Sequence, residues 1–252
     1  MSMRILPLLG LLLFPVAASA GPLGAARVNV LKGMAWRVHG AKERTPVAVG
    51  DAVASGEGLV TGAGAETRAE LGFADGSLVR LGAETEVTLG AEERGIELRA
   101  GRILVQSDRM LGGLGVHTAT LRLQPQGTTY LVTLGAEGST DVAVAVLEGA
   151  VRVARVPQEA ESPVVLPGET LRVQAKERPG ATPLAPFALD KALSGDPLIA
   201  APLRPLASLS RIRTLAVQQR RGVLAGRNER LRSELGWQRP AGGKVTVVPV
   251  TR

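Results

Sequence analysis

The sequence predicts an all-β domain that is followed by a linker and a basic α-helix, and three observations support this fold class. From Ala26 to about Val173, short runs alternate apolar with polar residues, as strands with one buried face do. The 31 glycines and 16 prolines punctuate these runs and interrupt almost every window that could form a helix. After about Lys176 the alternation gives way to a Pro/Gly/Ala-rich stretch and then to a helical spacing of apolar residues.

The first twenty residues have the pattern of a secretory signal peptide. Arg4 precedes an apolar stretch from Ile5 to Phe14, and Ala18-Ser19-Ala20 forms a small-residue cleavage site. We predict cleavage after Ala20 and a mature protein in the periplasm of a bacterium with two membranes. The apolar stretch is too short to span a bilayer comfortably, and we expect no transmembrane segment in the mature chain.

The β-domain is expected to span residues 26–175. Its runs include "RAELGF", "SLVRLG" and "DVAVAVLEG", and we predict a jelly roll or a short β-solenoid. Asp75-Gly76 is predicted to be a two-residue hairpin turn, since both residues tolerate positive φ, and a second hairpin tip is expected at Gly135–Gly138. Alternation places Glu70 on the solvent face beside Arg68 or Arg80, in a cross-strand charge pair.

The remainder divides into a linker over residues 176–205, an amphipathic helix over 206–236 and a tail over 237–252 with a possible edge strand at "KVTVV". Gly222 and Gly226 are expected to weaken the middle of the helix by about 1 kcal/mol each relative to alanine. The apolar stripe of this helix comprises Leu209, Ile212, Ala216, Val223 and Leu224.

Positive charge is concentrated in this last part of the chain. Residues 203–252 hold 11 of the 30 Lys and Arg residues but only 2 of the 23 Asp and Glu residues. One interpretation is a helix that packs its stripe on the β-domain and solvates its arginines. The other is contact with anionic lipid, an acidic protein or a cell-wall polyanion, whereas export removes nucleic acid as a partner. The residues predicted to bind such a partner are Arg211, Arg213, Arg220, Arg221, Arg227, Arg230 and Arg232.

Catalysis, metals and cofactors find little support in the sequence. His39 and His117 are the only histidines, and they lack the spacing of a metal-binding pair. The acidic residues between Asp51 and Asp75 do not form the ladder of oxygen ligands that Ca²⁺ needs. Only 2% of residues are aromatic, which disfavours a sugar-binding cleft or a platform for stacking bases. We therefore expect no enzyme activity, no cofactor and no metal site.

Three segments together resemble the FecR domain family. They are "VGDAVASGEGLVTGAGAETRAELGFADGSLVRLGAETEVTL" from Val49, "QGTTYLVTLGAEGSTDVAVAVLEGAVRV" from Gln126, and "LPGETLRV" from Leu166. The sequence departs from the family pattern at Thr118-Ala119, where the family often has Thr-Pro, and at Gln126, where it has Arg. The residues that carry the resemblance, as a structural signature, are Gly50, Asp51, Asp75, Gly76, Gly127, Thr128, Tyr130, Gly149 and Gly168.

The resemblance implies an all-β fold and an exported compartment. The iron-uptake regulators of the family carry an anti-sigma segment and a transmembrane helix before this domain, whereas here a signal peptide is predicted in that place. We expect a non-enzymatic binding or scaffolding module of the bacterial cell envelope, with an envelope protein or an anionic envelope component as its partner. The alternative is a periplasmic signalling component of a FecR-type pathway, either a transmembrane sigma regulator or an iron-uptake system.

Overall fold

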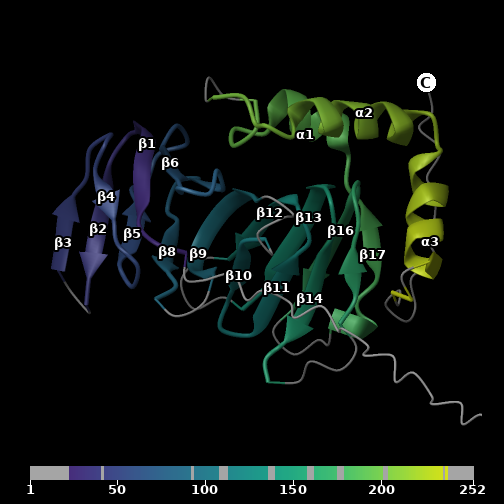
Figure 1. The fold of residues 1–252 in the computed structure, drawn as a ribbon, viewed down its shortest axis with the longest axis horizontal. Coiled ribbons are helices and arrows are strands. Elements are labelled where there is room, and N and C mark those ends of the chain that lie inside the picture. The colour runs from purple at the N-terminus through teal and green to yellow at the C-terminus, as the bar shows by residue number, and fades with distance from the viewer. Residues whose placement is uncertain are drawn as a thin grey trace, which may run out of the picture.

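The computed structural model describes residues 23–40, 43–91, 94–107, 113–135, 140–157, 162–174, 179–200, 204–234 and 236–237. These residues form mostly β-strands, with three α-helices and one short 3₁₀ helix towards the C-terminus (Figure 1). The all-β fold class is therefore confirmed. The predicted signal peptide, the hairpin tip beyond Gly135 and the tail after Trp237 lie outside the described residues.

The strands form two sheets that share one long strand, β9. Sheet A has the order β4 (Ala52–Val53), β1 (Ala26–Lys32), β6 (Arg68–Gly72), β7 (Leu78–Leu81), β9 (Gly95–Gln106), β12 (Thr129–Leu134), β13 (Val142–Glu148), β16 (Glu169–Val173) and β17 (Leu184–Pro186). Sheet B has the order β3 (Glu43–Pro46), β2 (Ala35–His39), β5 (Gly58–Thr61), β8 (Glu86–Leu89), β9, β10 (Gly115–His117), β11 (Leu121–Pro125), β14 (Val151–Arg155) and β15 (Val164–Val165). Among the described pairs only β9 and β10 are parallel, which favours the jelly-roll arrangement over a solenoid of stacked parallel turns.

Strand β9 passes from one sheet to the other at a glycine. Its first half pairs with β8 and β10 in sheet B, and its second half pairs with β7 and β12 in sheet A. Gly101, at the crossing, has a φ of +86°, and a Cβ there would lie 2.5 Å from the Cα of Thr85. Only glycine fits both the backbone angle and the close approach, so this residue lets one strand serve both sheets.

The inner faces of the two sheets form one hydrophobic core. Leu71 and Val144 of sheet A and Leu59 and Val87 of sheet B are all fully buried in it. This is the buried face that the alternating runs predict, and the Gly/Pro-rich turns lie at the ends of the strands.

The Asp75-Gly76 turn joins β6 to β7 as predicted, but its geometry differs from the prediction. The turn spans three residues, Ala74 to Gly76, and Gly76 alone among them has a positive φ, +82°. The carboxylate of Asp75 accepts a hydrogen bond from the backbone N–H of Ser77 at 2.8 Å and forms an ion pair with Arg94. A type I turn followed by an αL glycine needs positive φ at one position only, and Gly76 occupies it. Asp75 therefore keeps an ordinary backbone conformation, and its side chain bonds Ser77 and Arg94.

The segment predicted to be a linker is folded wherever the structure describes it. Residues 179–200 contain the 3₁₀ helix η2 (Pro179–Ala181), strand β17 and helix α1 (Leu189–Gly195). β17 extends sheet A by pairing with β16, and Leu189 and Ala192 of α1 are buried. The composition of this segment does not indicate a helix or a strand. Its short apolar runs nevertheless pack against the sheet.

The predicted C-terminal helix is present but divided. It forms α2 (Leu209–Arg220) and α3 (Leu224–Glu234), and the chain bends between them at Gly222, whose φ is +72°. Gly226 lies within α3 without interrupting it. α1 and α2 lie along one side of the sandwich, and α3 runs down along its end (Figure 1). Among the described residues, no helix is long and apolar enough to cross a membrane.

Candidate partner-binding surface

The outer face of sheet A is apolar and is covered by α1 and α2. Leu104, Leu131 and Leu147 point away from the central core and pack with Ile212 and Leu215 of α2 in a second hydrophobic cluster. Strands β12 and β13 are consequently buried on both faces. We call the described part of residues 189–234 the helical cover. Its helix α2 packs on the outer face of sheet A.

A buried ion pair anchors the cover to sheet A. The Nε of Arg80 donates to Glu70 at 2.9 Å, and both side chains are almost fully buried. The guanidinium of Arg80 also donates to the carbonyl oxygen of Leu198 at 2.8 Å and to that of Arg204. The predicted cross-strand pair therefore exists, but the prediction that Glu70 faces solvent is wrong, because the cover lies over this face of the sheet.

Three further polar contacts join sheet A to the cover. Arg102 of β9 forms an ion pair with the buried Asp196, which follows α1. At the start of α2, the hydroxyl of Thr129 donates to Ser208 at 2.7 Å, and Ser208 donates to Gln106 at 3.2 Å. Each of these buried polar groups has a partner, so the contacts fix the position of the cover without leaving an unsatisfied donor there.

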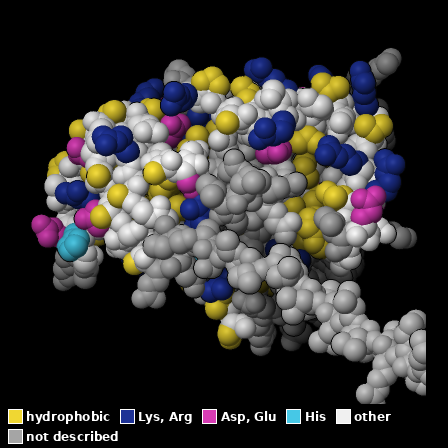
Figure 2. Space-filling model, in the orientation of Figure 1, with side chains coloured by type: hydrophobic (Ala, Val, Ile, Leu, Met, Phe, Trp, Pro, Cys, Tyr) yellow, Lys and Arg dark blue, Asp and Glu magenta, His cyan; other side chains and the backbone are white. Residues whose placement is uncertain are grey.

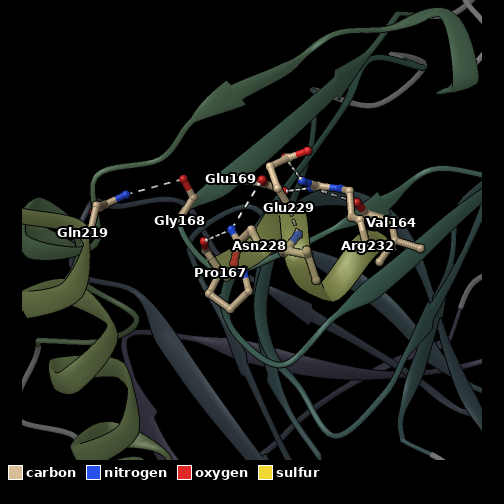
Figure 3. Close-up of polar contacts among 9 residues, drawn as sticks. Val164, Pro167, Gly168, Glu169, Gln219, Asn228, Glu229 and Arg232 are labelled. Carbon is tan, nitrogen blue, oxygen red and sulfur yellow. Dashed lines mark hydrogen bonds and ion pairs between the residues drawn. The ribbon is translucent and has the colours of Figure 1, made fainter. Parts of the chain in front are cut away.

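Helix α3 is held by polar contacts with the turn before β16 (Figure 3). Asn228 donates from Nδ2 to the carbonyl oxygen of Pro167 at 3.0 Å and to Glu169 at 3.4 Å. Arg232 forms ion pairs with Glu169 and with Glu229 of its own helix. Arg232 was predicted to bind a partner, but it is buried and already paired, so it belongs to the packing of α3 and not to the exposed surface.

The end of α2 contacts the same turn. Gln219 donates from Nε2 to the carbonyl oxygens of Phe187, at 2.8 Å, and Gly168, at 3.5 Å (Figure 3). Its Oε1 accepts a hydrogen bond from the backbone N–H of Leu189 at 2.9 Å. A Cβ at Gly168 would lie 2.6 Å from Gln219, so the family glycine at this position allows the close approach of α2.

Three of the arginines predicted to bind a partner are exposed and have neither a side-chain hydrogen bond nor an ion pair within the described residues. They are Arg213 on α2, Arg221 at the bend and Arg230 on α3. No described side chain forms an ion pair with any of them. Figure 2 shows Lys and Arg side chains along the upper edge and right-hand side of the molecule, where α2 and α3 lie in Figure 1.

Two other predicted residues are exposed but have acidic neighbours. Arg211 donates from Nε to Glu148 at 2.9 Å, and Arg220 lies 3.3 Å from a carboxylate oxygen of Asp190. Both arginine side chains remain more than half exposed, at 62% and 65%. Exposed pairs of this kind contribute little to stability, and each guanidinium keeps donors that face solvent.

A groove of about 760 Å³ lies between α2, α3 and the turn from β13 to β14. Its base and walls are largely apolar, from Pro125, Leu215, Leu231 and Trp237. Arg211 and Arg227 stand on the two helices that line it. The sequence predicted the arginines but not the groove, because the groove depends on the bend at Gly222 and on the turn at Glu148–Ala150.

The signature residues lie in turns and in the core, and one of them, Gly149, lines the groove together with Arg211 and Arg227. The hydroxyl of Thr128 donates to the carbonyl oxygen of Ala150 at 2.8 Å and thereby joins two turns. Burial raises the pKa of Tyr130, whose protonated hydroxyl donates to the carbonyl oxygen of Leu114 at 2.7 Å. The carboxylate of Asp51 accepts a hydrogen bond from the backbone N–H of Ala48 at 2.8 Å, within the same turn. Positive φ angles are found at Gly50, Gly76, Gly127, Gly149 and Gly168.

The described residues contain no group of three or more His, Asp or Glu side chains that could hold a metal ion. His39, in β2, lies 3.4 Å from Glu57, and His117 lies in β10. The two histidines are on different strands of sheet B, which are separated by β5, β8 and β9. The structure does not bring them together.

Residues 58–152 match the family model described as FecR protein. This part of the chain is a FecR domain. It runs from β5 into β14 and supplies strands to both sheets, and α1, α2 and α3 lie after it. The recognition made from the sequence is thus confirmed over these residues.

Two solved structures are similar to the chain. Both are of a proposed anti-sigma factor from Parabacteroides distasonis ATCC 8503, at 1.65 Å and 2.50 Å resolution. Each is 19% identical, with a TM-score of 0.44, over 55% of this chain. The matched region covers 65% of the first and 64% of the second. A search of curated proteins found no match.

Proposed function

We propose that this protein is an exported, non-enzymatic binding or scaffolding module of the bacterial cell envelope, which contacts an anionic envelope component through its helical cover. The FecR domain provides the rigid body, and the cover presents arginines to solvent. In this proposal the mature chain begins after Ala20 and acts in the periplasm.

The observation that carries the proposal is the outward, unpaired position of Arg213, Arg221 and Arg230. Buried contacts of the cover with sheet A use other side chains, such as Ile212 and Arg80. These three arginines therefore add little to packing, and their charges are free to attract an anionic surface. Such attraction falls as salt is added, because exposed charges are screened beyond about 10 Å at 0.1 M ionic strength.

Charge reversal tests the proposal without disturbing the fold. We expect the variant R213E/R221E/R230E to lose co-sedimentation with cell envelopes at low salt. The matched control R44E/R99E/R172E makes the same change of charge at exposed positions on strands β3, β9 and β16. Control binding should remain close to that of the parent chain. Equal loss in both variants, or loss in neither, contradicts the proposal.

Deleting residues 203–252 is a poorer experiment. Without α2, the apolar face of sheet A that includes Leu104, Leu131 and Leu147 would be exposed to water. An exposed apolar patch of this kind promotes non-specific association, so the deleted chain could sediment for reasons unrelated to its charge.

The FecR domain favours one second candidate function, a periplasmic signalling component of a FecR-type pathway. Such a component needs a separate membrane partner to reach the cytoplasm. Crosslinking of the mature protein in its native envelope, followed by identification of the captured proteins, tests this candidate. A transmembrane sigma regulator or an outer-membrane receptor among them supports signalling, and a purely structural partner contradicts it.

A further inference from the structure

We propose that the groove between α2 and α3 binds an extended, acidic segment of a partner protein. This inference rests on the proposed function and deepens it, because it names the chemistry of the partner and separates the groove from the outward arginines. The partner segment would place apolar side chains on the base of the groove and carboxylates against Arg211 and Arg227.

The shape and lining of the groove suit a peptide. Leu215 of α2, Leu231 of α3 and Trp237 supply apolar surface along it, and its volume of about 760 Å³ holds several residues of extended chain. Trp237 is only partly buried. A partly exposed tryptophan in a concave site is the kind of residue that supplies much of the binding free energy in protein interfaces.

The lining carries two arginines and one glutamate, Glu148, so its net charge is positive and favours an acidic occupant. Glu148 holds the Nε of Arg211 at 2.9 Å and fixes the orientation of that guanidinium at the rim. Across the groove, the exposed Arg227 donates from Nη1 to the neutral Gln218 at 3.1 Å, so its charge is not neutralised by that contact. Guanidinium groups bind carboxylates through paired, charge-assisted hydrogen bonds, which are stronger than those between neutral groups.

The walls of the groove are fixed before any ligand arrives. α2 is held by the apolar cluster on sheet A, and α3 is held by Asn228 and Arg232 against the turn that contains Glu169 (Figure 3). A site whose walls are already ordered loses little conformational entropy on binding. This ordered geometry distinguishes the groove from a charged surface that only attracts counterions.

Two other occupants fit the groove less well. Residues 238–252 follow Trp237 directly, but they carry Arg239, Lys244 and Arg252 and no acidic side chain, so the two groove arginines repel them. An anionic bilayer is a broad surface that would meet the outward Arg213 and Arg230 before it reached the base of a concave groove.

The test uses two ten-residue peptides labelled with fluorescein, one alternating Glu with Leu and the other alternating Lys with Leu. In an extended chain, alternate side chains point to opposite faces, so Leu can face the base while Glu reaches the rim. Binding to the mature full-length chain is followed by fluorescence anisotropy at low salt. Unlabelled versions of both peptides are used for tryptophan emission in a W36F background, in which Trp237 is the only tryptophan. Trp36 lies in β2, at the opposite end of the molecule from α3 (Figure 1).

The matched variants are R227E and R230E, which make the same change on one helix at two exposed positions. Only Arg227 lines the groove. We expect the Glu–Leu peptide to bind, the Lys–Leu peptide not to bind, and Trp237 emission to shift to shorter wavelength on binding. R227E should weaken binding by about tenfold or more, and R230E by about threefold or less, since direct contacts outweigh screened charges.

Several results would overturn the proposal. One is equal weakening by R227E and R230E, and another is peptide binding that leaves Trp237 emission unchanged. Binding that appears only after residues 238–252 are removed would assign the groove to the chain's own tail. Binding to phosphatidylglycerol vesicles but not to the peptide would identify a membrane contact. If R213E/R221E/R230E abolishes envelope binding while the peptide fails to bind, the groove proposal falls and the proposed function stands.

Discussion

The outer faces of the two sheets are built from similar alternating strands, but one face is covered by helices and the other is exposed to solvent. The outer face of sheet A carries Leu104, Leu131 and Leu147 and is covered by helices. The outer face of sheet B carries the exposed Glu97 and Arg99 of β9. The difference shows that the C-terminal helices are part of the folded domain on one side only, and the other side keeps the polar surface that simple alternation predicts.

Both faces contain a pair of arginine and glutamate, and the two pairs have different roles. On sheet A, Arg80 and Glu70 are almost fully buried and hold the cover. On sheet B, Arg99 and Glu97 are about half exposed, and the hydrogen bond between them raises the pKa of Arg99. A buried Arg–Glu pair is important for the structure, because loss of one partner leaves an unpaired buried charge, which is costly. An exposed Arg–Glu pair changes the free energy of unfolding very little.

The largest expected effect is that of R80A. It would leave Glu70 buried without its partner and remove two hydrogen bonds to the cover, and we expect a loss of about 3–5 kcal/mol in the free energy of unfolding. Urea denaturation measures this loss. The control R99A, on sheet B, should change stability by no more than about 1 kcal/mol. Similar values for the two variants would remove the distinction between the faces.

The next effect is that of I212A, which creates a cavity between α2 and sheet A. Ile212 is fully buried there, and we expect a loss of about 2–5 kcal/mol on thermal or urea unfolding. V223A is the control, because Val223 is 55% exposed at the bend before α3, and its effect should stay within about 0.5 kcal/mol. If I212A were as mild as V223A, the cover would not be packed on sheet A.

The smallest effect concerns the exposed carboxylate of Glu66, which forms ion pairs with Lys32 and, at 3.4 Å, with Arg68. The hydrogen bond and charge of Lys32 lower the pKa of Glu66. A lowered folded-state pKa contributes stability above the unfolded value, near 4.3, and that contribution is lost as pH falls through the folded pKa. We expect E66Q to be slightly less stable than the parent chain at pH 7. The difference should vanish at a pH below both pKa values, and a difference that grows there would contradict this sign.

The sequence predicted the strands well because their information is local. Alternation and Gly/Pro punctuation identify each run, and the ordered FecR segments add the domain. The same alternation failed at Glu70, since the group that covers it is distant: Arg80 bonds to Leu198 and Arg204, which are 118 and 124 residues further along the chain. A signal was present in "TYLVTL" and "VAVAVLE", whose apolar residues occur at both alternating positions and indicate strands covered on both faces.

The candidate surface was predicted in part. Charge counting identified the arginines, and the exposed ones are on the cover. It could not separate Arg232 from the rest, because its partner Glu169 is 63 residues away and its burial depends on how α3 packs. Composition likewise indicated a linker over residues 176–205, because Pro and Gly report local preference. They do not report the apolar contacts that Leu189 and Leu198 make with the sheet.

Native-state hydrogen exchange tests most directly whether the helical cover is an integral part of the domain. The amides of α2 (Leu209–Arg220) and of β13 (Val142–Glu148) should be protected with similar free energies close to that of global unfolding, because the two elements share one cluster on sheet A. In R80A, protection of α2 should fall more than that of β13. If the amides of α2 exchanged near the rate of an unfolded chain while those of β13 stayed fully protected, the account would be contradicted. The helices would then not be packed on the domain.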